Sequence, residues 1–469
     1  MGKDKFTARL VLAIIAAALG SGFQHGYHTG VINVPQSVLK DWLNSTYEGS
    51  YGSYLDESFL NVLWGVTTSI MNVGGTIGGL LCGVVSNKFG PKNGLFLNNI
   101  LVAIATILMG MAKPINSIEV MIVGRLVIGV NCGLNAGLCP MYLSEISPVS
   151  LRGAVSSVYQ LVITISILVA QIVGLGCILG NDVNWPYLFI LPIFFAIFQV
   201  ITLVLCPESP RYLLGVKHDM HKAEKSLKHL RMTDDIAEEM AEIKHADEAE
   251  KALPKVTFKD MVKERSLKIP LLIAMALMVA QQFSGINAVI FYSTDTFVKA
   301  GLEGNNPQYA TIGIGVVNVL MTVVSVFLVE IAGRKTLLMV GFGGMAIITL
   351  LLSIALKFAD KDQAIPWICI ILVFVYIILF AAGAGSIPWF LVTEIFNQAA
   401  RPKAVSLAVP TNWIANFIVT LTFPSIESAI GPFVFLIFVI LNVGFFIFIM
   451  RMVPETKNKT VEEITAQWK

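Results

Sequence analysis

Twelve long apolar segments, separated by short polar ones, constrain the fold of this chain more than any other feature. A helix needs about 20 mostly apolar residues to cross a bilayer, and a helix satisfies its own backbone hydrogen bonds inside lipid. Only 14% of the 469 residues are charged, against about 25% in soluble domains. The sequence therefore predicts an all-α membrane protein with twelve transmembrane helices. The predicted spans are Leu10–Ile32, Phe59–Val85, Gly94–Ala112, Val120–Leu143, Ala154–Leu179, Pro186–Cys206, Ile269–Val298, Tyr309–Ile331, Thr336–Leu356, Ile365–Val392, Ala404–Phe423 and Gly431–Arg451.

One polar stretch divides these spans into two sets of six. Pro207–Lys268 carries 13 basic and 13 acidic residues together with helix-forming runs, so we expect a cytoplasmic helical linker there. The expected units are an N-terminal six-helix bundle over 1–206, the linker over 207–268, a C-terminal six-helix bundle over 269–451 and a cytoplasmic tail over 452–469.

The distribution of basic residues predicts the orientation in the membrane. Cytoplasmic loops carry an excess of Lys and Arg. In the twelve-span arrangement the basic residues on one side are Lys3, Lys5, Arg9, Lys88, Lys92, Arg152, Arg334, Lys335, Arg401, Lys403, Arg451 and Lys457. Those on the other side are Lys40, Lys113, Lys299, Lys357 and Lys361. We therefore expect a multi-pass protein of the plasma membrane with both termini in the cytoplasm.

The first outer loop contains a glycosylation sequon, Asn44-Ser45-Thr46. It falls on the side of the membrane where glycans are added, so Asn44 is the expected glycosylation site.

A short motif recurs half a chain apart. Glu145 precedes Arg152 by seven positions, and Glu394 precedes Arg401 by the same spacing, 249 positions later. Each pair lies at the junction of two apolar segments. Further polar motifs repeat at offsets near 246, which predicts two structurally related bundles. Carriers built from parallel repeats bind their substrate near the midplane between the halves.

In these motifs the chain resembles the sugar porters of the major facilitator superfamily, and among them the animal facilitative glucose transporters. The resemblance covers almost the whole chain. It rests on Gly124-Arg125 with Glu145 and Arg152, on Pro207–Arg211, Gln281–Asn287, Gly333–Lys335, Ile387–Phe390, Asn412-Trp413 and Pro454–Thr456. The chain departs from the usual family pattern at Lys88 and Pro91, where two arginines are common, and at Ala381, where a glutamate is common.

Carboxamides in the apolar segments are the candidate sugar ligands. They both donate and accept hydrogen bonds without a charge, and a charge in mid-membrane costs at least about 2.5–3.5 kcal/mol. The resemblance implies that five of them contact sugar, namely Gln160, Gln281, Gln282, Asn287 and Asn318. Aromatic rings would complete such a site, and we expect Trp389 to cover the apolar C–H face of the sugar and Phe380 to form part of a lid or floor. Asn412 and Asn416 fit either a sugar contact or a bond between helices. The candidate sugar-binding residues are Gln160, Gln281, Gln282, Asn287, Asn318, Trp389, Asn412, Asn416 and Phe380.

Gly285 lies between the amides of the seventh span, at a place where a helix can loosen.

Charged residues at helix ends predict a gate. Two halves that move need a contact that forms in one state and breaks in the other, and the fork of arginine suits carboxylates and helix-end carbonyls. We expect an ionic latch that closes the cytoplasmic side and stabilises the outward-open state. The candidate gate residues, all placed at cytoplasmic helix ends, are Arg125, Glu145, Arg152, Glu208, Glu330, Arg334, Glu394, Arg401 and Glu455.

The first span indicates how transport is driven. Proton-linked sugar porters tend to carry an aspartate where this chain has His28, and the span contains no Asp or Glu. This favours facilitative uniport of a hexose, with D-glucose as the expected substrate. His25 and His28 keep a proton-coupled symporter open as an alternative, because histidine titrates near neutral pH. A sugar sensor that does not transport is the other alternative.

Other classes of function are disfavoured. Gly333-Arg334-Lys335-Thr336 lacks the order and the upstream glycine of a phosphate-binding loop, so an ATP-driven enzyme is not expected. The six cysteines lack zinc-ligand spacing, and we expect neither a metal nor a cofactor. A net charge of +2 does not point to nucleic acid. The expected partners are the hexose and the lipid bilayer, with no obligate protein partner.

Overall fold

The computed structural model describes residues 6–253, 256–397, 399–457, 459, 463–464 and 466, and its regular elements are helices. The first half contains α1 (Ala8–Ala17), α2 (Phe23–Gly30), α3 (Gln36–Tyr51), α4 (Glu57–Phe89), α5 (Pro91–Met111), α6 (Ile118–Ile146), α7 (Arg152–Val173), α8 (Trp185–Ile190) and α9 (Pro192–Val204). Four helices follow outside the bundles: α10 (Pro210–Gly215), α11 (Met220–Arg231), α12 (Ala237–Ala252) and α13 (Phe258–Lys263). The second half contains α14 (Arg265–Gln281), α15 (Asn287–Lys299), α16 (Asn306–Ala332), α17 (Arg334–Lys357), α18 (Ile365–Ala382), α19 (Ile387–Glu394), α20 (Arg401–Ile430) and α21 (Val434–Met452).

The helices agree with the predicted spans. In the described part of the chain, ten helical stretches are long and apolar enough to cross a membrane. One of these, Arg401–Met452, contains both α20 and α21, and α7 adds the shorter apolar stretch Ser157–Val173. The predicted fold class, an all-α membrane protein of twelve transmembrane helices, is confirmed.

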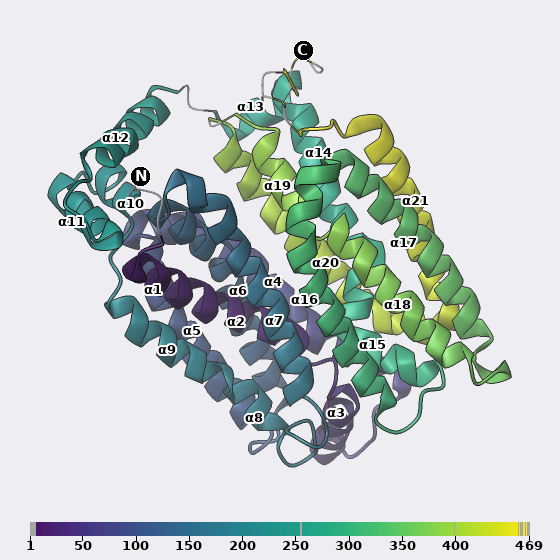
Figure 1. The fold of residues 1–469 in the computed structure, drawn as a ribbon. Helices are drawn as coiled ribbons and strands as arrows, with labels where there is room; N and C mark the ends of the chain where they lie inside the picture. The colour runs from purple at the N-terminus through teal and green to yellow at the C-terminus, as the bar shows by residue number, and fades with distance from the viewer. Residues whose placement is uncertain are drawn as a thin grey trace.

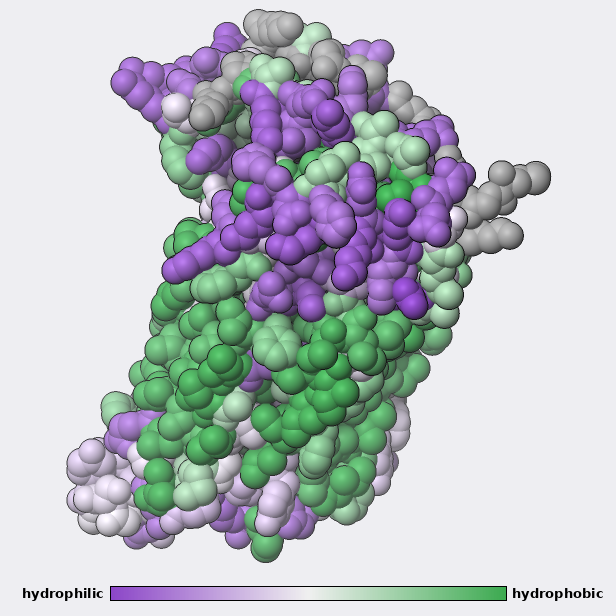
Figure 2. Space-filling view, turned by 90° about the vertical axis from the view of Figure 1, so that its left-hand side faces the viewer, coloured by the Kyte–Doolittle hydropathy of each residue, from purple (hydrophilic) through white to green (hydrophobic). Residues whose placement is uncertain are grey.

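The two halves stand side by side, and the linker helices lie at one end of the molecule (Figure 1). The N-terminus and the C-terminus lie at this same end, which we call the linker end. The helix α3 lies at the opposite end, which we call the α3 end. Figure 2 shows a broad hydrophobic surface below the hydrophilic linker end, as expected for a chain surrounded by lipid.

Several spans are interrupted near their middles, and these interruptions position the polar site. The first span has a π-helical turn at Ala18–Gly22 between α1 and α2. The seventh has one at Gln282–Ile286 between α14 and α15, where Gly285 has φ 104°. The tenth is divided between α18 and α19. Interrupted helices in a membrane expose backbone groups that other residues must satisfy.

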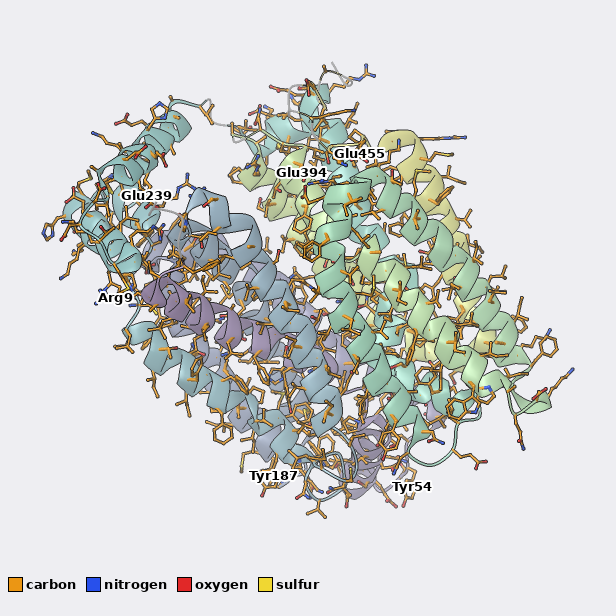
Figure 3. The ribbon with its side chains drawn as sticks, in the orientation of Figure 1. Arg9, Tyr54, Tyr187, Glu239, Glu394 and Glu455 are labelled. Atoms are coloured by element: carbon orange, nitrogen blue, oxygen red, sulfur yellow. The ribbon has the colours of Figure 1, made fainter. Side chains whose placement is uncertain are left out.

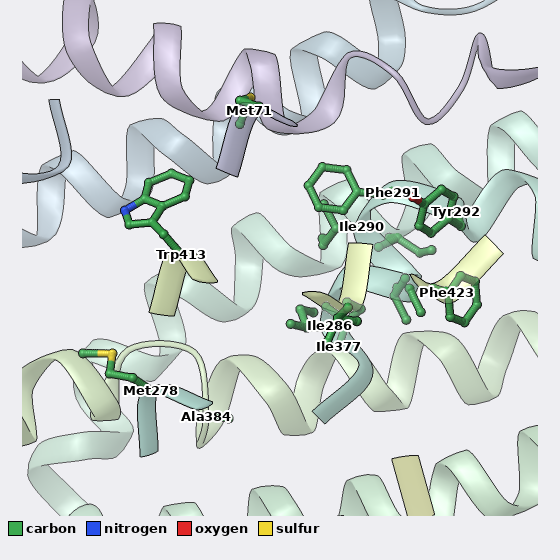
Figure 4. Packing of buried hydrophobic residues seen from close by; sticks show 14 of the residues in the cluster. Met71, Met278, Ile286, Ile290, Phe291, Tyr292, Ile377, Ala384, Trp413 and Phe423 are labelled. Atoms are coloured by element: carbon green, nitrogen blue, oxygen red, sulfur yellow. The ribbon is translucent and has the colours of Figure 1, made fainter. Parts of the chain in front are cut away.

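The halves pack through two pairs of long helices, α4 against α20 and α7 against α16. Small residues permit the first contact, since a Cβ at Gly75 would lie 2.4 Å from the ring of Trp413. Figure 4 shows Trp413 directed from α20 toward the helix that carries Met71.

Candidate functional site

Four of the predicted sugar-binding residues form one hydrogen-bonded cluster inside the second half. Gln282 Nε2 donates to Gln281 Oε1 at 3.2 Å and to Asn412 Oδ1 at 3.0 Å. Asn287 Nδ2 donates to Gln282 Oε1 at 2.8 Å, and Asn412 Nδ2 donates to Gln281 Oε1 at 2.8 Å. All four are buried. Carboxamides that pair with one another can exchange these bonds for sugar hydroxyls without leaving a charge in the membrane.

The break in the tenth span is fixed by this cluster. Gln281 Nε2 donates to the carbonyls of Ala384 and Gly385 at 2.8 Å and 2.7 Å. These carbonyls lie between α18 and α19, where the helix no longer pairs them. Gln281 thus joins the seventh span to the turn that precedes Trp389, and it has a structural role besides any contact with sugar.

The predicted loosening at Gly285 is confirmed. Its positive φ ends the regular helix and leaves the carbonyl of Ser284 outside the helical pattern. Tyr376 Oη and Asn442 Nδ2 donate to this carbonyl at 3.1 Å and 3.0 Å. The break therefore changes the direction of the seventh span between Gln282 and Asn287 while its backbone remains satisfied.

The other predicted sugar-binding residues lie outside the cluster. Gln160 on α7 is exposed, whereas Asn318 on α16 and Phe380 on α18 are half-buried. Trp389, in the first turn of α19, is 36% exposed.

Asn416 lies at the contact between the halves. It accepts a hydrogen bond from Asn72 Nδ2 at 3.0 Å, and this bond joins α20 to α4.

Aromatic rings close the middle of the interface. His25 of the first half stacks on Trp413 of the second, with ring centroids 5.6 Å apart, and its Nδ1 lies 3.0 Å from Tyr159 Oη. Trp413 follows Asn412 directly, so the stacked pair lies beside the amide cluster.

The halves are bonded most densely toward the α3 end. Asn33 Nδ2 donates to the carbonyl of Ile290 and to Ser293 Oγ, both at 2.8 Å, and Asn33 Oδ1 accepts from the backbone N–H of Thr294 at 3.2 Å. The hydroxyls of Thr68 and Tyr292 lie 2.9 Å apart.

Arg125 corrects one sequence prediction, because it does not lie with the other gate residues. It is fully buried two turns from the start of α6, and that helix begins at the α3 end. Its guanidinium donates to the carbonyls of His28, Thr67 and Thr68. The prediction overlooked that an even-numbered span runs toward the linker end, so that its first residues lie at the far end. Arg125 therefore links α2 to α4, and on α4 it binds the backbone of Thr68, whose hydroxyl contacts Tyr292.

At the linker end the predicted gate residues form two separate groups, one in each half. Glu145 accepts from Ser209 Oγ, and Arg152 Nε donates to the carbonyl of Ser147 at 3.4 Å. Both bonds therefore lie within the first half or join it to the linker residue Ser209, and neither reaches the second half.

The second half has a similar group that also contains an ion pair. Glu394 Oε1 lies 2.9 Å from Arg334 Nη2, and Glu330 lies 3.6 Å from the same atom but is 75% exposed. Arg401 donates to the carbonyl of Phe396 at 3.2 Å. Figure 3 shows Glu394 and Glu455 together at the linker end, with Tyr54 and Tyr187 at the opposite end.

Glu208 and Glu455 bind helix N-termini in equivalent ways. Glu208 accepts from the backbone N–H groups of Lys92 and Asn93, at 2.9 Å and 3.1 Å. Burial raises the pKa of Glu208 above its ordinary value, although these N–H groups and that of Ser209 favour the ionised form. A carboxylate placed on the first turn of α5 also interacts favourably with the helix dipole.

Glu455 does the same for α17. It accepts from the backbone N–H groups of Arg334 and Lys335 at 2.9 Å and 3.0 Å. Burial opposes its ionisation, but the N–H groups of Lys457, Arg334, Lys335 and Thr456 together hold the pKa of Glu455 below its ordinary value. The polar repeat in the sequence thus corresponds to two carboxylate-capped helices.

A second amide network, inside the first half, was missed by sequence reasoning. Gln24 donates to Asn99 at 2.8 Å, and its Oε1 accepts from Asn131 at 3.3 Å and from Asn135 at 3.1 Å. Asn99 in turn donates to Gln199 Oε1 at 2.9 Å. The density of Asn residues in the third and fourth apolar segments was the available signal. The network is buried, and its hydrogen bonds link α2, α5, α6 and α9 within the first half.

The predicted glycosylation site lies on the α3 end. Asn44 is half-buried within α3, and its Oδ1 accepts from the backbone N–H of Leu55 at 2.9 Å.

This fold, with two helical halves and a buried amide cluster beside a broken span, defines a membrane carrier of the major facilitator type. Residues 13–468 match the family model "Sugar (and other) transporter". The facilitated glucose transporter member 3 of solute carrier family 2 from Mus musculus is 45% identical over 464 residues, which are 99% of this chain and 94% of that protein. The counterpart from Rattus norvegicus is also 45% identical, over 99% of this chain and 94% of that protein.

Solved structures give the same result. The xylose transporter XylE from E. coli, in a partially occluded inward open conformation, is 28% identical with a TM-score of 0.81, and the match covers 97% of this chain and 100% of that one. XylE bound to 6-bromo-6-deoxy-D-glucose, a proton:xylose symporter, has a TM-score of 0.78 at 29% identity, over 99% of this chain and 100% of that one. The chain belongs to the sugar transporter family and is a multi-pass membrane protein, a transporter rather than an enzyme.

Proposed function

We propose that this protein is a facilitative hexose uniporter that carries D-glucose across the plasma membrane by alternating access. The observation that carries the proposal is the uncharged cluster of Gln281, Gln282, Asn287 and Asn412 beside the break in the seventh span. It supplies several donors and acceptors inside the second half, next to Trp413, which stacks on His25 of the first half. Relatives 45% identical over nearly the whole chain are facilitated glucose transporters.

The modest affinity that a carrier needs is consistent with such a site. Millimolar binding requires only about −4 kcal/mol, and a hydrogen bond contributes about 1 kcal/mol net. Gln160, Asn318, Trp389 and Phe380 complete the proposed site, with Trp389 stacking on the apolar face of the sugar.

The linker end is proposed to face the cytoplasm, with both termini there and with Asn44 glycosylated on the outer side. In this orientation the structure corresponds to an inward-facing state, in which the latch formed by Arg152, Arg401 and their acidic neighbours is open. The hydrogen bonds from Asn33 and between Thr68 and Tyr292 support this, because they join the halves toward the α3 end.

Uptake of labelled D-glucose by proteoliposomes containing the purified protein tests the transport proposal. We expect saturable uptake in both directions that a pH gradient does not change and that unlabelled hexoses reduce by competition. Uptake that drives proton movement would instead establish the symporter, which is the activity named for the structural neighbour XylE. Binding of glucose without uptake would establish a sensor.

Substitution of two glutamines tests the proposed site. Gln160→Leu removes a proposed sugar contact and no hydrogen bond described within the protein, so it is expected to lower uptake about tenfold, since about 1.4 kcal/mol corresponds to a factor of ten, without a change in melting temperature. Gln281→Leu also leaves the carbonyls of Ala384 and Gly385 unpaired, so we expect it to lower both uptake and melting temperature. Thr422→Val, on an exposed face of α20, is the control. Normal uptake by both glutamine variants would contradict the assignment.

A further inference from the structure

One buried side chain at the interface between the halves lacks any hydrogen-bond partner. Gln171 on α7 is fully buried, and neither its Nε2 nor its Oε1 has a partner among the described residues. Its carboxamide packs on the backbone of α16, because a Cβ added at Gly315 would lie 2.2 Å from Gln171 Oε1. The side chain of Leu168 lies on the same glycine, at 3.0 Å from that Cβ position. The amide is therefore enclosed between the two halves.

Burial without partners makes Gln171 unfavourable in this conformation. A buried donor or acceptor that forms no hydrogen bond carries the full free-energy cost of its removal from water. An apolar side chain of the same shape has no such cost. Gln160 gives the contrast on the same helix. It lies eleven residues earlier, about three turns away on the same face, and it is exposed.

The enclosure of Gln171 depends on closure toward the α3 end. The next polar contact in that direction is the backbone N–H of Gly176, which lies 3.5 Å from Gln308 Oε1 of α16. In an alternating-access cycle the α3 end opens when the linker end closes. Separation of α7 from α16 there would expose the carboxamide of Gln171 to water, and the free-energy cost of burying it would disappear.

We propose that Gln171 is a conformational-balance residue of the transport cycle, which disfavours the state with a closed α3 end and so favours the state that opens toward the outer side. The proposal rests on the alternating-access function proposed above. It concerns the equilibrium between the end states and assigns Gln171 no contact with the sugar.

The equilibrium can be measured with two spin labels at the linker end of the purified full-length protein. Asn87→Cys on α4 and Ala332→Cys on α16 place labels at exposed positions in different halves. Cys177→Ser removes the exposed cysteine, and the five other cysteines are buried. Pulsed electron paramagnetic resonance then gives a longer distance for the linker-open state and a shorter one for the linker-closed state.

The main variant is Gln171→Met, which removes the carboxamide and retains the length of the side chain. We expect the ratio of linker-open to linker-closed molecules to rise about tenfold, which corresponds to about 1.4 kcal/mol. The matched control is Gln171→Asn, which keeps the carboxamide and is expected to leave the ratio close to that of the parent protein.

A second variant acts on the other side of the same contact, with the opposite sign. Gly315→Ala introduces a Cβ against Gln171 and Leu168, so it is expected to lower the same ratio about tenfold. Combination with Gln171→Ala removes most of that clash, and the ratio of the double variant is expected to return toward that of Gln171→Ala alone. This non-additivity is the signature of a direct contact.

The outcomes separate this inference from the proposed function. If D-glucose and the latch variant Arg152→Ala both leave the distance ratio of the parent unchanged, alternating access is wrong and this inference falls with it. If the parent responds but Gln171→Met leaves the ratio unchanged or lowers it, only the role of Gln171 is wrong. A rise with Gln171→Met, no rise with Gln171→Asn and a fall with Gly315→Ala support it.

Discussion

At the scale of single residues, two glycines show how a repeated motif is used. Gly90 and Gly333 have φ of 91° and 85°, and each directly precedes a helix capped by a glutamate. A Cβ would lie 2.5 Å from Glu208 Oε2 at Gly90 and 2.7 Å from Glu455 Oε2 at Gly333. Glycine is thus required at both positions by its backbone conformation and by the approach of the carboxylate.

Gly333→Ala is expected to destabilise the protein by about 2 kcal/mol, because a backbone with φ 85° and ψ 163° costs an alanine roughly 1–3 kcal/mol and the carboxylate of Glu455 must also move. The measurement is the midpoint of thermal unfolding of the purified protein. Gly83→Ala is the control, since a Cβ there meets open space within α4, and it should be neutral or slightly stabilising. Equal effects of the two variants would contradict this explanation.

The two capping glutamates predict opposite dependence on pH. The pKa of Glu455 is lowered in the folded protein, so its stabilisation is present above the ordinary glutamate pKa of about 4.3 and is lost as the pH falls through the folded value. The pKa of Glu208 is raised, so its contribution is full below about 4.3 and is lost as the pH rises through the folded value.

Melting temperatures measured between about pH 3 and pH 7 test this difference. Glu455→Gln should lose less stability on acidification than the parent protein, and Glu208→Gln should lose more. A change of the same sign in both variants would show that the two carboxylates do not differ in this way.

At the scale of elements, the interruption of the seventh span positions the amide cluster. Gly285 has a positive φ, and a Cβ there would lie 3.1 Å from the ring of Phe438. Gln282 is the first residue of the interruption and Asn287 follows it, yet the two side chains are hydrogen-bonded at 2.8 Å. The geometry of the site therefore depends on this turn.

Gly285→Ala should lower glucose uptake about tenfold or more, because alanine at this φ costs roughly 1–2 kcal/mol and displaces Gln282 relative to Asn287. Initial rates in proteoliposomes measure the effect. Gly444→Ala is a control within a span, since its Cβ would meet open space. Retained uptake in Gly285→Ala would show that the turn does not position the site.

At the scale of the whole molecule, polar contacts between the halves are concentrated away from the linker end. Asn33 and Tyr292 join the halves toward the α3 end, while Arg152 and Arg401 donate to carbonyls of their own halves. Two rigid bodies with such one-sided contacts are suited to rocking, since closure of one end accompanies opening of the other.

Arg152→Ala should increase the linker-open population, because the proposed latch forms only when the linker end closes. The bond that Arg152 makes in the present conformation, to the carbonyl of Ser147 at 3.4 Å, is weak. The distance between labels at Asn87 and Ala332 measures the population. Lys244→Ala removes an exposed charge of α12 whose described ion pair, with Glu248, lies within the same helix, and it is the control. An unchanged linker-open population in Arg152→Ala would contradict the proposed latch.

Much of the site could be predicted because membrane chemistry restricts polar residues so strongly. The apolar segments contain few amides, because a polar side chain is costly inside a membrane. This made four of them candidates: Gln281, Gln282, Asn287 and Asn412. The same reasoning could not separate sugar ligands from structural partners. Gln281 also holds the carbonyls of the tenth span, and Asn416 bonds to Asn72 across the interface. Which partner an amide finds depends on helix rotation and crossing, which the sequence pattern does not specify.

The sequence by itself determined the membrane class, the number of spans, the repeated polar motifs and the family, since these depend on local hydropathy and on residues adjacent in the chain. Only the tertiary structure decided that Arg125 donates to carbonyls of α2 and α4, that the Glu145 and Glu394 groups stay in separate halves, and that Gln171 is enclosed without a partner among the described residues. These facts depend on which helices meet and at which end. The physical reason is that hydropathy favours burial of a helix in lipid but does not specify its neighbours.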